Sequence, residues 1–361
     1  MKRPVHTAAI TLLAVGLMAF FLRNASLERV WSELLGARRD LFAGAVLCTV
    51  VVYLVRVVRW RYLLRPIGPT RFRTAFRATI IGFALNSLVP GRVGEVVRPF
   101  VLARSERLSA AAAFATIVVE RLLDLLVVCL IFGGIVVLSG PQQSAAGTAL
   151  LATMRTGAAL AGLVGMGALA LAFALAADPR RAGRLAERLT SWAPAGVARR
   201  LAGQVGRFLE GAAAACRPRP LAVALLWTFV LWGATAMSLW YVSRAFGIQL
   251  DAAGASVMLG LIVVGGAVPT PGGIGSFHAA YQLGATVLYG ATDDQAVGAA
   301  LVLHLLSFGP VSALGLVFMA QDGLRLAGMR SLAEGEAAAA ASQSGAAAVP
   351  LPAAPEDRRL P

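Results

Sequence analysis

Uninterrupted apolar runs of about twenty residues dominate this chain, and an α-helix needs that length to cross roughly 30 Å of membrane hydrocarbon. The runs are continuous and rich in Ala, Leu, Val and Gly, whereas a membrane β-barrel has segments of about ten residues with alternating hydrophobicity. Only 14% of the residues are charged, compared with about a quarter in soluble domains. The sequence therefore predicts an all-α fold, a polytopic helical bundle in a membrane.

The order of the apolar runs predicts six full membrane spans and two broken apolar regions. The spans are expected at about 5–22, 41–64, 109–139, 149–176, 220–243 and 295–320. The broken regions, about 74–103 and 253–291, have prolines and glycines near their middles, and these residues interrupt a helix. We interpret each broken region as a re-entrant pair of short helices that enters and leaves the membrane on one side.

Outside these segments the chain is polar or of low complexity. The cytoplasmic loop 178–219 is rich in arginine and predicts an amphipathic surface helix, and the mixed-charge stretch 23–40 predicts another on the outer surface. Residues 331–361 are rich in Ala, with Pro and Ser. We therefore expect a disordered C-terminal tail after a transmembrane domain that covers 1–330.

Arginine is concentrated in alternate loops, and this distribution predicts the orientation. By the positive-inside rule, the arginine-rich loops and both termini face the cytoplasm. The net charge of +15 thus belongs to membrane flanks, and we expect no nucleic-acid partner. Lys2 is the only lysine beside many arginines, a bias typical of GC-rich bacteria, so a bacterial inner membrane is the expected location.

This orientation makes the two halves of the chain similar units of opposite direction. Residues 5–139 and 149–325 each contain two spans, a broken region and a further span. The broken regions would enter from opposite sides of the membrane. Many secondary transporters contain such inverted repeats, with the binding site where broken helices meet near the midplane. The pattern therefore predicts an inverted repeat around a central site.

The first broken region carries polar residues around its proline–glycine break. Arg92 and Arg98 supply guanidinium groups that fit phosphate oxygens, and Asn86 precedes the break. A short helix that begins after the break would add free N–H groups, which bind anions. Glu95 and Arg98 are three residues apart and can pair on one helix face. We predict an anion site; a cytoplasmic loop with solvated charges is the alternative.

The second broken region has two prolines and three glycines within 269–275, which no continuous helix tolerates. Irregular backbone at membrane depth is buried in protein or lines a cavity, so Gly272 and Gly273 are candidate binding residues. His278 would lie in the first turn of the next helix, as a hydrogen-bond donor or proton carrier. His304 in the sixth span is interpreted as a hydrogen bond between helices. A tight outer loop is the alternative for this region.

The third span contains Glu120, Arg121 and Asp124 within an apolar run. Each charged side chain costs roughly 2.5–3.5 kcal/mol at the bilayer centre on insertion scales, so such groups have partners or a function. Arg121 and Asp124 can neutralise each other, and Glu120 then needs a partner such as Arg92 or Arg98. The alternative is a purely stabilising ion network between helices.

Patterns of soluble enzymes are absent from the sequence. It contains no GxSxG, Walker A, HExxH or paired CxxC motif. The three cysteines, Cys48, Cys129 and Cys216, are too scattered for a disulfide framework or a metal site. We therefore expect a transporter rather than an enzyme, without catalytic residues, cofactor or metal.

Three motifs in order resemble those of the lysylphosphatidylglycerol synthase transmembrane-region family. They are N-x3-P-x-R-x-GE-x2-R at 86–98, ER-x2-D at 120–124 and PTPGGIG at 269–275. The resemblance covers about 5–325 and implies a lipid-translocating or lipid-handling domain with a cavity near the two re-entrant segments. The cytosolic aminoacyl-transfer domain has no counterpart here, so lysylation of lipid by this chain is not expected. Many relatives carry Glu where this chain has His278, which weakens a proton-coupling role for that position.

The leading hypothesis is an inner-membrane flippase for a phosphate-bearing lipid. The residues expected to bind the lipid are Asn86, Arg92, Glu95, Arg98, Glu120, Arg121, Asp124, Gly272, Gly273 and His278. One alternative is a membrane-embedded transferase that acts on a polyprenyl phosphate or a phospholipid headgroup. Another is an accessory scaffold for a lipid or glycan synthase. The expected partners are an anionic lipid, a synthase or glycosyltransferase, and a second copy of the chain in a homodimer.

Overall fold

A computed structural model describes residues 26–89, 92–138, 145–178, 195–266, 268 and 270–322, together with Gly16, Met18 and Leu22. Helices and short connections make up these parts, and they contain no β-strand. The all-α prediction is therefore confirmed for the described residues. The predicted tail 331–361 lies outside them, as does nearly all of the predicted first span.

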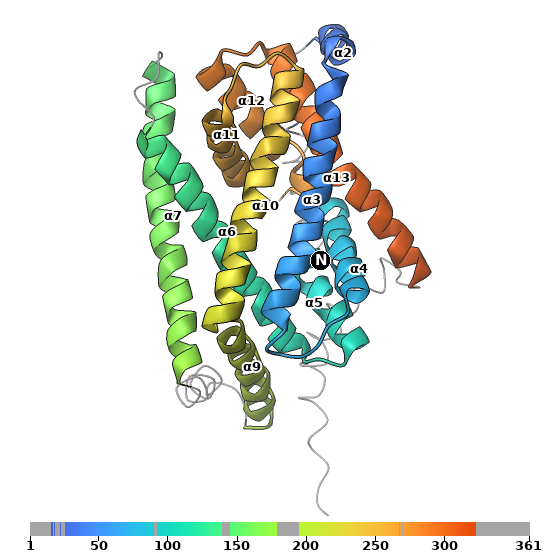
Figure 1. Ribbon diagram of the computed structural model, residues 1–361, viewed down its shortest axis with the longest axis vertical. Helices are drawn as coiled ribbons and strands as arrows, with labels where there is room; N and C mark the ends of the chain where they lie inside the picture. Colours follow the sequence, from blue (N-terminus) through green and yellow to red (C-terminus); the bar gives the residue numbers. More distant parts are fainter. Residues whose placement is uncertain are drawn as a thin grey trace, which may run out of the picture.

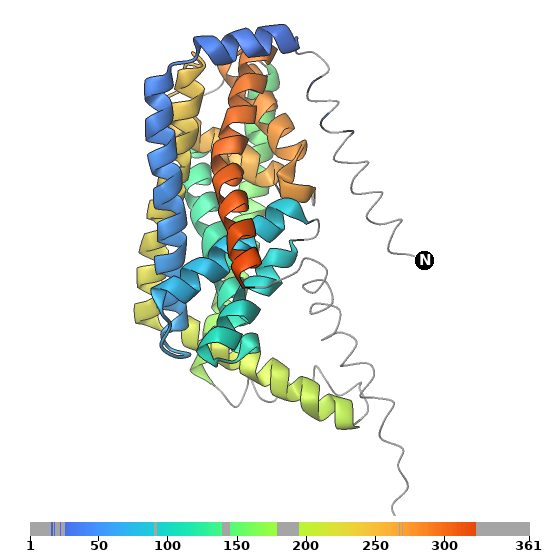
Figure 2. The ribbon, with the colours of Figure 1, turned by 90° about the vertical axis from the view of Figure 1, so that its right-hand side faces the viewer.

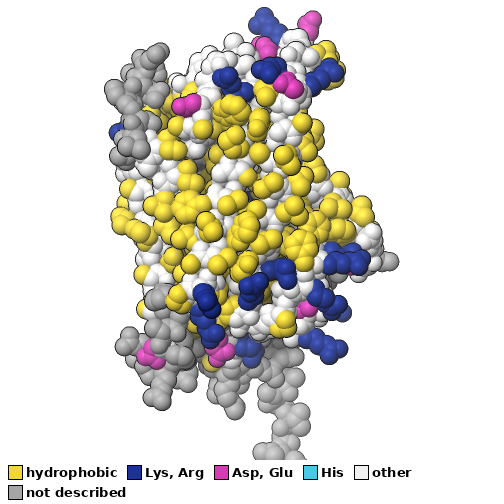
Figure 3. Space-filling model, in the orientation of Figure 1, with side chains coloured by type: hydrophobic (Ala, Val, Ile, Leu, Met, Phe, Trp, Pro, Cys, Tyr) yellow, Lys and Arg dark blue, Asp and Glu magenta, His cyan; other side chains and the backbone are white. Residues whose placement is uncertain are grey.

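Five long helices extend along the molecule (Figure 1). They are α3 (Arg39–Leu64), α6 (Ala110–Leu138), α7 (Ala145–Ala177), α10 (Pro218–Ala245) and α13 (Asp293–Gln321), of which α6 and α13 run obliquely. Four of them, α3, α7, α10 and α13, are long and apolar enough to cross a membrane. α6 has 29 residues, but three charged residues interrupt its apolar sequence. Apolar side chains cover the middle of the visible face, and most charged ones lie towards its ends (Figure 3). These features are those of an integral membrane protein.

Each predicted broken region contains two short helices. The first consists of α4 (Phe72–Leu88) and α5 (Val93–Glu106), and the second of α11 (Ala252–Gly265) and α12 (Ser276–Tyr289). The 3₁₀ turn η1 (Pro271–Gly273) lies within the second break. The chain therefore changes direction between α4 and α5 and between α11 and α12, within the predicted broken regions.

Two further helices lie at opposite ends of the bundle. α2 (Leu27–Gly36) lies across one end, and α9 (Ala195–Ala215) projects from the other end (Figure 2). In α2, Val30 is buried while Glu28 and Arg29 are exposed, so the helix is amphipathic as predicted. Helices were also expected within 23–40 and 178–219, and both are present.

Small residues allow the helices to approach closely, as is common in membrane bundles. α4 and α5 meet at Gly82 and Gly94, where a Cβ on Gly94 would lie 1.8 Å from the carbonyl oxygen of Gly82. α3 packs along α10, α4 against α13, and α6 against α7 and α9. This packing brings α3, α5, α6 and α10 together around one buried polar group.

Candidate functional site

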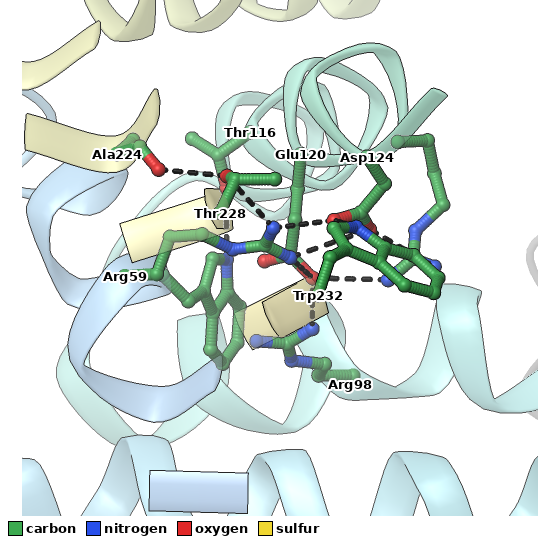
Figure 4. A network of polar contacts seen from close by, with 10 residues as sticks. Arg59, Arg98, Thr116, Glu120, Asp124, Ala224, Thr228 and Trp232 are labelled. Atoms are coloured by element: carbon green, nitrogen blue, oxygen red, sulfur yellow. Dashed lines mark hydrogen bonds and ion pairs between the residues drawn. The ribbon is translucent and has the colours of Figure 1, made fainter. Parts of the chain in front are cut away.

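Five charged side chains from three helices form a buried group, here called the arginine–carboxylate cluster. Arg59 comes from α3, Arg98 from α5, and Glu120, Arg121 and Asp124 from α6. Arg59, Arg98, Glu120 and Asp124 are buried. Figure 4 shows the carboxylate of Glu120 between the guanidinium groups of Arg59 and Arg98. Residues up to 65 positions apart in the sequence thus share one polar centre.

Glu120 is the centre of the cluster. Its Oε1 atom lies 3.0 Å from Nη2 of Arg59, 3.0 Å from Nη1 of Arg98 and 3.0 Å from Nη2 of Arg121. Its Oε2 atom is buried and accepts no hydrogen bond from the described residues. One carboxylate oxygen therefore contacts three guanidinium groups, which makes Glu120 their shared counter-ion.

Asp124 continues the cluster towards α10. Both of its carboxylate oxygens accept hydrogen bonds from Arg59, and Oδ1 also accepts one from Nε1 of Trp232, at 3.1 Å. Arg121 Nη1 lies 3.4 Å from Asp124 Oδ2. Nη1 of Arg59 donates in addition to Oγ1 of Thr228, at 3.0 Å. Arg59 therefore links α3, α6 and α10.

Arg98 has an unused hydrogen-bonding edge. Its guanidinium carbon lies 3.9 Å from the centre of the Trp60 ring, so the planar group stacks on an aromatic face. Trp60 is itself held by a hydrogen bond from Nε1 to Oγ1 of Thr116, at 2.9 Å. Nη1 of Arg98 donates to Glu120, whereas the buried Nε and Nη2 atoms have no partner among the described residues. Those two donors form one edge of the guanidinium and match two oxygens of a phosphate or carboxylate.

Positive charge exceeds negative charge in and around the cluster. Arg56 on α3 interacts electrostatically with Asp124, and its Nη1 atom is buried without a partner in the described part of the chain. Glu95 on α5 is partly exposed and interacts electrostatically with Arg121. When Arg56 and Glu95 are added to the five residues of the cluster, the group contains four arginines and three carboxylates. A surplus of buried positive charge favours an anion as the missing partner.

Two of the ion pairs predicted for the first broken region and the third span are present, and one predicted pair is absent. Arg98 pairs with Glu120, and Arg121 pairs with Asp124, as expected. The predicted pair of Glu95 with Arg98 does not form, because Arg98 turns to Glu120 instead. Glu95 has no ion pair within the ranges that the structure describes.

Two other residues of the first break lie outside the cluster. Arg92 is exposed, and its Nη2 atom donates to the carbonyl oxygen of Gly266 at 2.6 Å, across to the second break. Asn86 lies on α4 with its buried Oδ1 atom unpartnered in the described structure, close to Gly94. Both therefore belong to the contact between short helices rather than to the arginine–carboxylate cluster.

The predicted residues of the second break form a separate group. Gly272 and Gly273 have φ angles of 59° and 71°, a conformation that favours glycine. The Nδ1 atom of His278 accepts a hydrogen bond from the N–H of Gly275 at 3.3 Å and so caps α12. The role of His278 as a hydrogen-bond donor or proton carrier stays a prediction. His304 Nε2 lies 3.0 Å from the carbonyl oxygen of Gly272, so it joins α13 to η1 as predicted.

The sequence prediction missed Arg59 and the side chains around it. Arg56 and Arg59 lie inside the apolar run 41–64, near its arginine-rich end, and were not among the predicted binding residues. Their depth in the run was the available signal, because arginine within a span usually has a partner or a function. Thr228 and Trp232 gave no comparable signal, since such residues are common in apolar helices.

The described residues contain no group of three or more His, Cys, Asp or Glu side chains that could hold a metal ion. What the cluster can do chemically is bind an anion. Its donors are guanidinium groups, and each of its carboxylates already forms ion pairs with them.

Comparison with known proteins gives one family and two similar proteins. Residues 7–315 match the family described as "Lysylphosphatidylglycerol synthase TM region". A UPF0104 membrane protein of Methanocaldococcus jannaschii is 25% identical over 116 residues, which are 31% of this chain and 33% of that protein. Glycosyltransferase AglD of Haloferax volcanii is 26% identical over 327 residues, 82% of this chain and 50% of that protein. The matches thus span between a third and a half of the length of these relatives.

Proposed function

Because the chain belongs to the lysylphosphatidylglycerol synthase transmembrane-region family, we propose that it binds a phosphate-bearing lipid and moves it between the two leaflets of a bacterial inner membrane. The observation that carries this proposal is the unused edge of Arg98, within a buried cluster that has more arginines than carboxylates. A lipid phosphate would supply both the two acceptors and the negative charge.

The burial of Arg98 adds a requirement for movement. Its side chain is only 3% exposed, so a headgroup reaches Nε and Nη2 only after the surrounding helices separate. A transporter in which a closed centre opens alternately to each side has this property. A static lipid-binding scaffold would instead keep its receptor open to the lipid.

The packing of the helices supports an inverted repeat. α3, the pair α4–α5 and α6 follow one another in the first half, and α10, the pair α11–α12 and α13 follow in the same order in the second. α3 packs on its counterpart α10, while α4 packs on α13 and α11 packs on α6. We propose six full spans, cytoplasmic termini, and broken helices that re-enter from opposite sides.

A transport assay with a matched arginine control tests the proposal. Purified protein in phosphatidylcholine vesicles is assayed with fluorescent phosphatidylglycerol or polyprenyl phosphate, whose outer-leaflet fraction is quenched by dithionite. Arg98→Ala should lower the rate at least about tenfold, and Arg98→Lys should be intermediate because lysine keeps the charge but lacks the fork. Arg77→Lys is the control, because Arg77 pairs with Asp322 at 2.6 Å at the end of α13. Equal rates in the wild type and Arg98→Ala, or none above protein-free vesicles, would contradict the proposal.

The likeness to glycosyltransferase AglD favours a second candidate, in which the chain delivers a lipid to a glycosyltransferase or modifies the lipid itself. A membrane transferase would leave a covalently altered lipid after incubation with donor substrate, and mass spectrometry would detect it. A transporter leaves the lipid unchanged.

A further inference from the structure

Arg121 differs from the rest of the arginine–carboxylate cluster in its exposure. Its side chain is 34% exposed, whereas those of Arg59, Arg98, Glu120 and Asp124 are 7% exposed or less. Arg121 is therefore the member of the cluster that a molecule outside the bundle meets first.

The contacts of Arg121 can be lost without leaving a carboxylate unpaired. Without them, Glu120 still has Arg59 and Arg98 within 3.0 Å, and Asp124 still accepts hydrogen bonds from Arg59 and Trp232. Arg59, in contrast, contacts both carboxylates, and its removal would leave Asp124 with Trp232 and, as its only cation in the cluster, the more distant Arg121. The network therefore depends on Arg59, while Arg121 can exchange its partners.

The position of Arg121 in α6 also points to a polar ligand. It is the twelfth residue of that helix, roughly 16 Å from its start at 1.5 Å per residue. A charged side chain at such depth requires polar partners, and Arg121 has Glu120 and Asp124 while 34% of its side chain remains exposed. Glu95, also partly exposed, interacts with it from α5, which packs against α6.

We propose that Arg121 is the arginine that receives the headgroup, at the edge where α5 packs against α6. It releases Glu120 and Asp124, takes the phosphate through its guanidinium, and brings it towards the unused edge of Arg98. This inference rests on the proposed lipid-binding function, and it assigns Arg59 a structural role and Arg121 a substrate-contacting one.

Cysteine accessibility tests the position of Arg121 without a transport assay. In a chain with Cys48, Cys129 and Cys216 replaced by serine, Arg121→Cys is treated with a sulfonate-bearing methanethiosulfonate in phosphatidylcholine vesicles. Val119→Cys, at a residue 1% exposed on the same helix, is the control. Position 121 should react at least about tenfold faster than 119, because only position 121 of the two is exposed in the bundle. Equal rates at both positions would overturn the inference.

Transport by Arg121 variants then separates this inference from the proposed function. Arg121→Gln should raise the half-saturating fraction of the fluorescent lipid about tenfold, which corresponds to ~1.4 kcal/mol, with Tm close to the wild type. Arg121→Lys should recover part of the loss, and Arg59→Gln should lower Tm strongly. If Arg121→Gln lowers Tm as much as Arg59→Gln, or transports like the wild type, the inference fails while the proposed function stands. If the wild type itself moves no probe, the proposed function fails, and the labelling rates alone decide whether position 121 is accessible from outside the bundle.

Discussion

Arg98 on α5 and Glu120 on α6, 22 residues apart in the sequence, form an ion pair inside the bundle with 3.0 Å between Nη1 and Oε1. The pair ties the second half of the first broken region to the long helix beside it. Since Oε1 also contacts Arg59 and Arg121, the loss of one carboxylate affects three cations at once.

Glu120→Gln should destabilise the protein by about 3–5 kcal/mol, because it leaves buried arginines without their counter-ion. Tm in detergent measures the loss. Asp40→Asn is the matched control, because Asp40 pairs with Arg38 at 2.7 Å on an exposed surface, where ion pairs contribute little. A change in Tm for Glu120→Gln no larger than that for Asp40→Asn would show that the cluster does not stabilise the fold.

Gly94→Ala should force α4 and α5 apart, because the new Cβ would lie 1.8 Å from the carbonyl oxygen of Gly82. Backbone must move to relieve this contact, so we expect a loss of at least about 1–3 kcal/mol, visible as a lower Tm. Gly133→Ala in α6 has no atom within 4 Å of its Cβ and should be neutral or slightly stabilising. Similar Tm values for the two variants would mean that α4 and α5 are not in close contact.

The sequence was sufficient for features that depend on local chemistry. Prolines and glycines located both breaks, and the helices that follow begin after them, at Val93 and Ser276. Charged residues three or four apart in an apolar run identified Glu120 and Asp124 as a polar centre. The ends of α3, α10 and α13 agree with the predicted spans because apolar length determines them.

The composition of the cluster could not be predicted in the same way, because its members come from different helices. Arg59 meets Asp124 across 65 residues, and which side of α3 faces α6 depends on the packing of the whole bundle. Arg98 had two carboxylates within reach, Glu95 by helical spacing and Glu120 by tertiary contact. Glu120 is its partner because it is fully buried and centred among three arginines.

Arg92→Gly should relieve backbone strain at the first break and also remove a contact between the two breaks. Arg92 has φ 54°, a left-handed conformation that costs roughly 1–2 kcal/mol for a residue with a side chain, so glycine relieves strain. The substitution also removes the hydrogen bond to Gly266 that joins the two breaks. If this contact holds the closed state of the proposed transporter, transport should become faster without a loss of Tm.

Arg107→Gly is the control for that experiment. Arg107 has φ 57° at the C-terminal end of α5, so glycine relieves similar strain there without affecting the contact between the breaks. It should raise Tm slightly and leave the transport rate unchanged. Equal transport rates for Arg92→Gly, Arg107→Gly and the wild type would exclude the Arg92–Gly266 contact as a gate.

Cys216, in the turn between α9 and α10, should react slowly with maleimide despite lying outside the membrane spans. Burial raises the pKa of its thiol from an ordinary value of 9.0 to about 11, because the apolar surroundings disfavour the thiolate. Ionisation alone should then slow labelling about a hundredfold near neutral pH, since only the thiolate reacts. The rate should still rise at pH 10, where an ordinary thiol is already mostly ionised.

The same shift makes folding stability fall as the pH rises from 9 to 11, because the thiol of the unfolded chain ionises first. Labelling at a series of pH values, with Cys48 and Cys129 replaced by serine, measures the ionisation of Cys216. Ser105→Cys, combined with Cys216→Ser in that background, provides an exposed comparison at the end of α5. Equal rates for the two thiols at pH 7 would show that Cys216 is accessible and that α9 does not pack against the bundle as described.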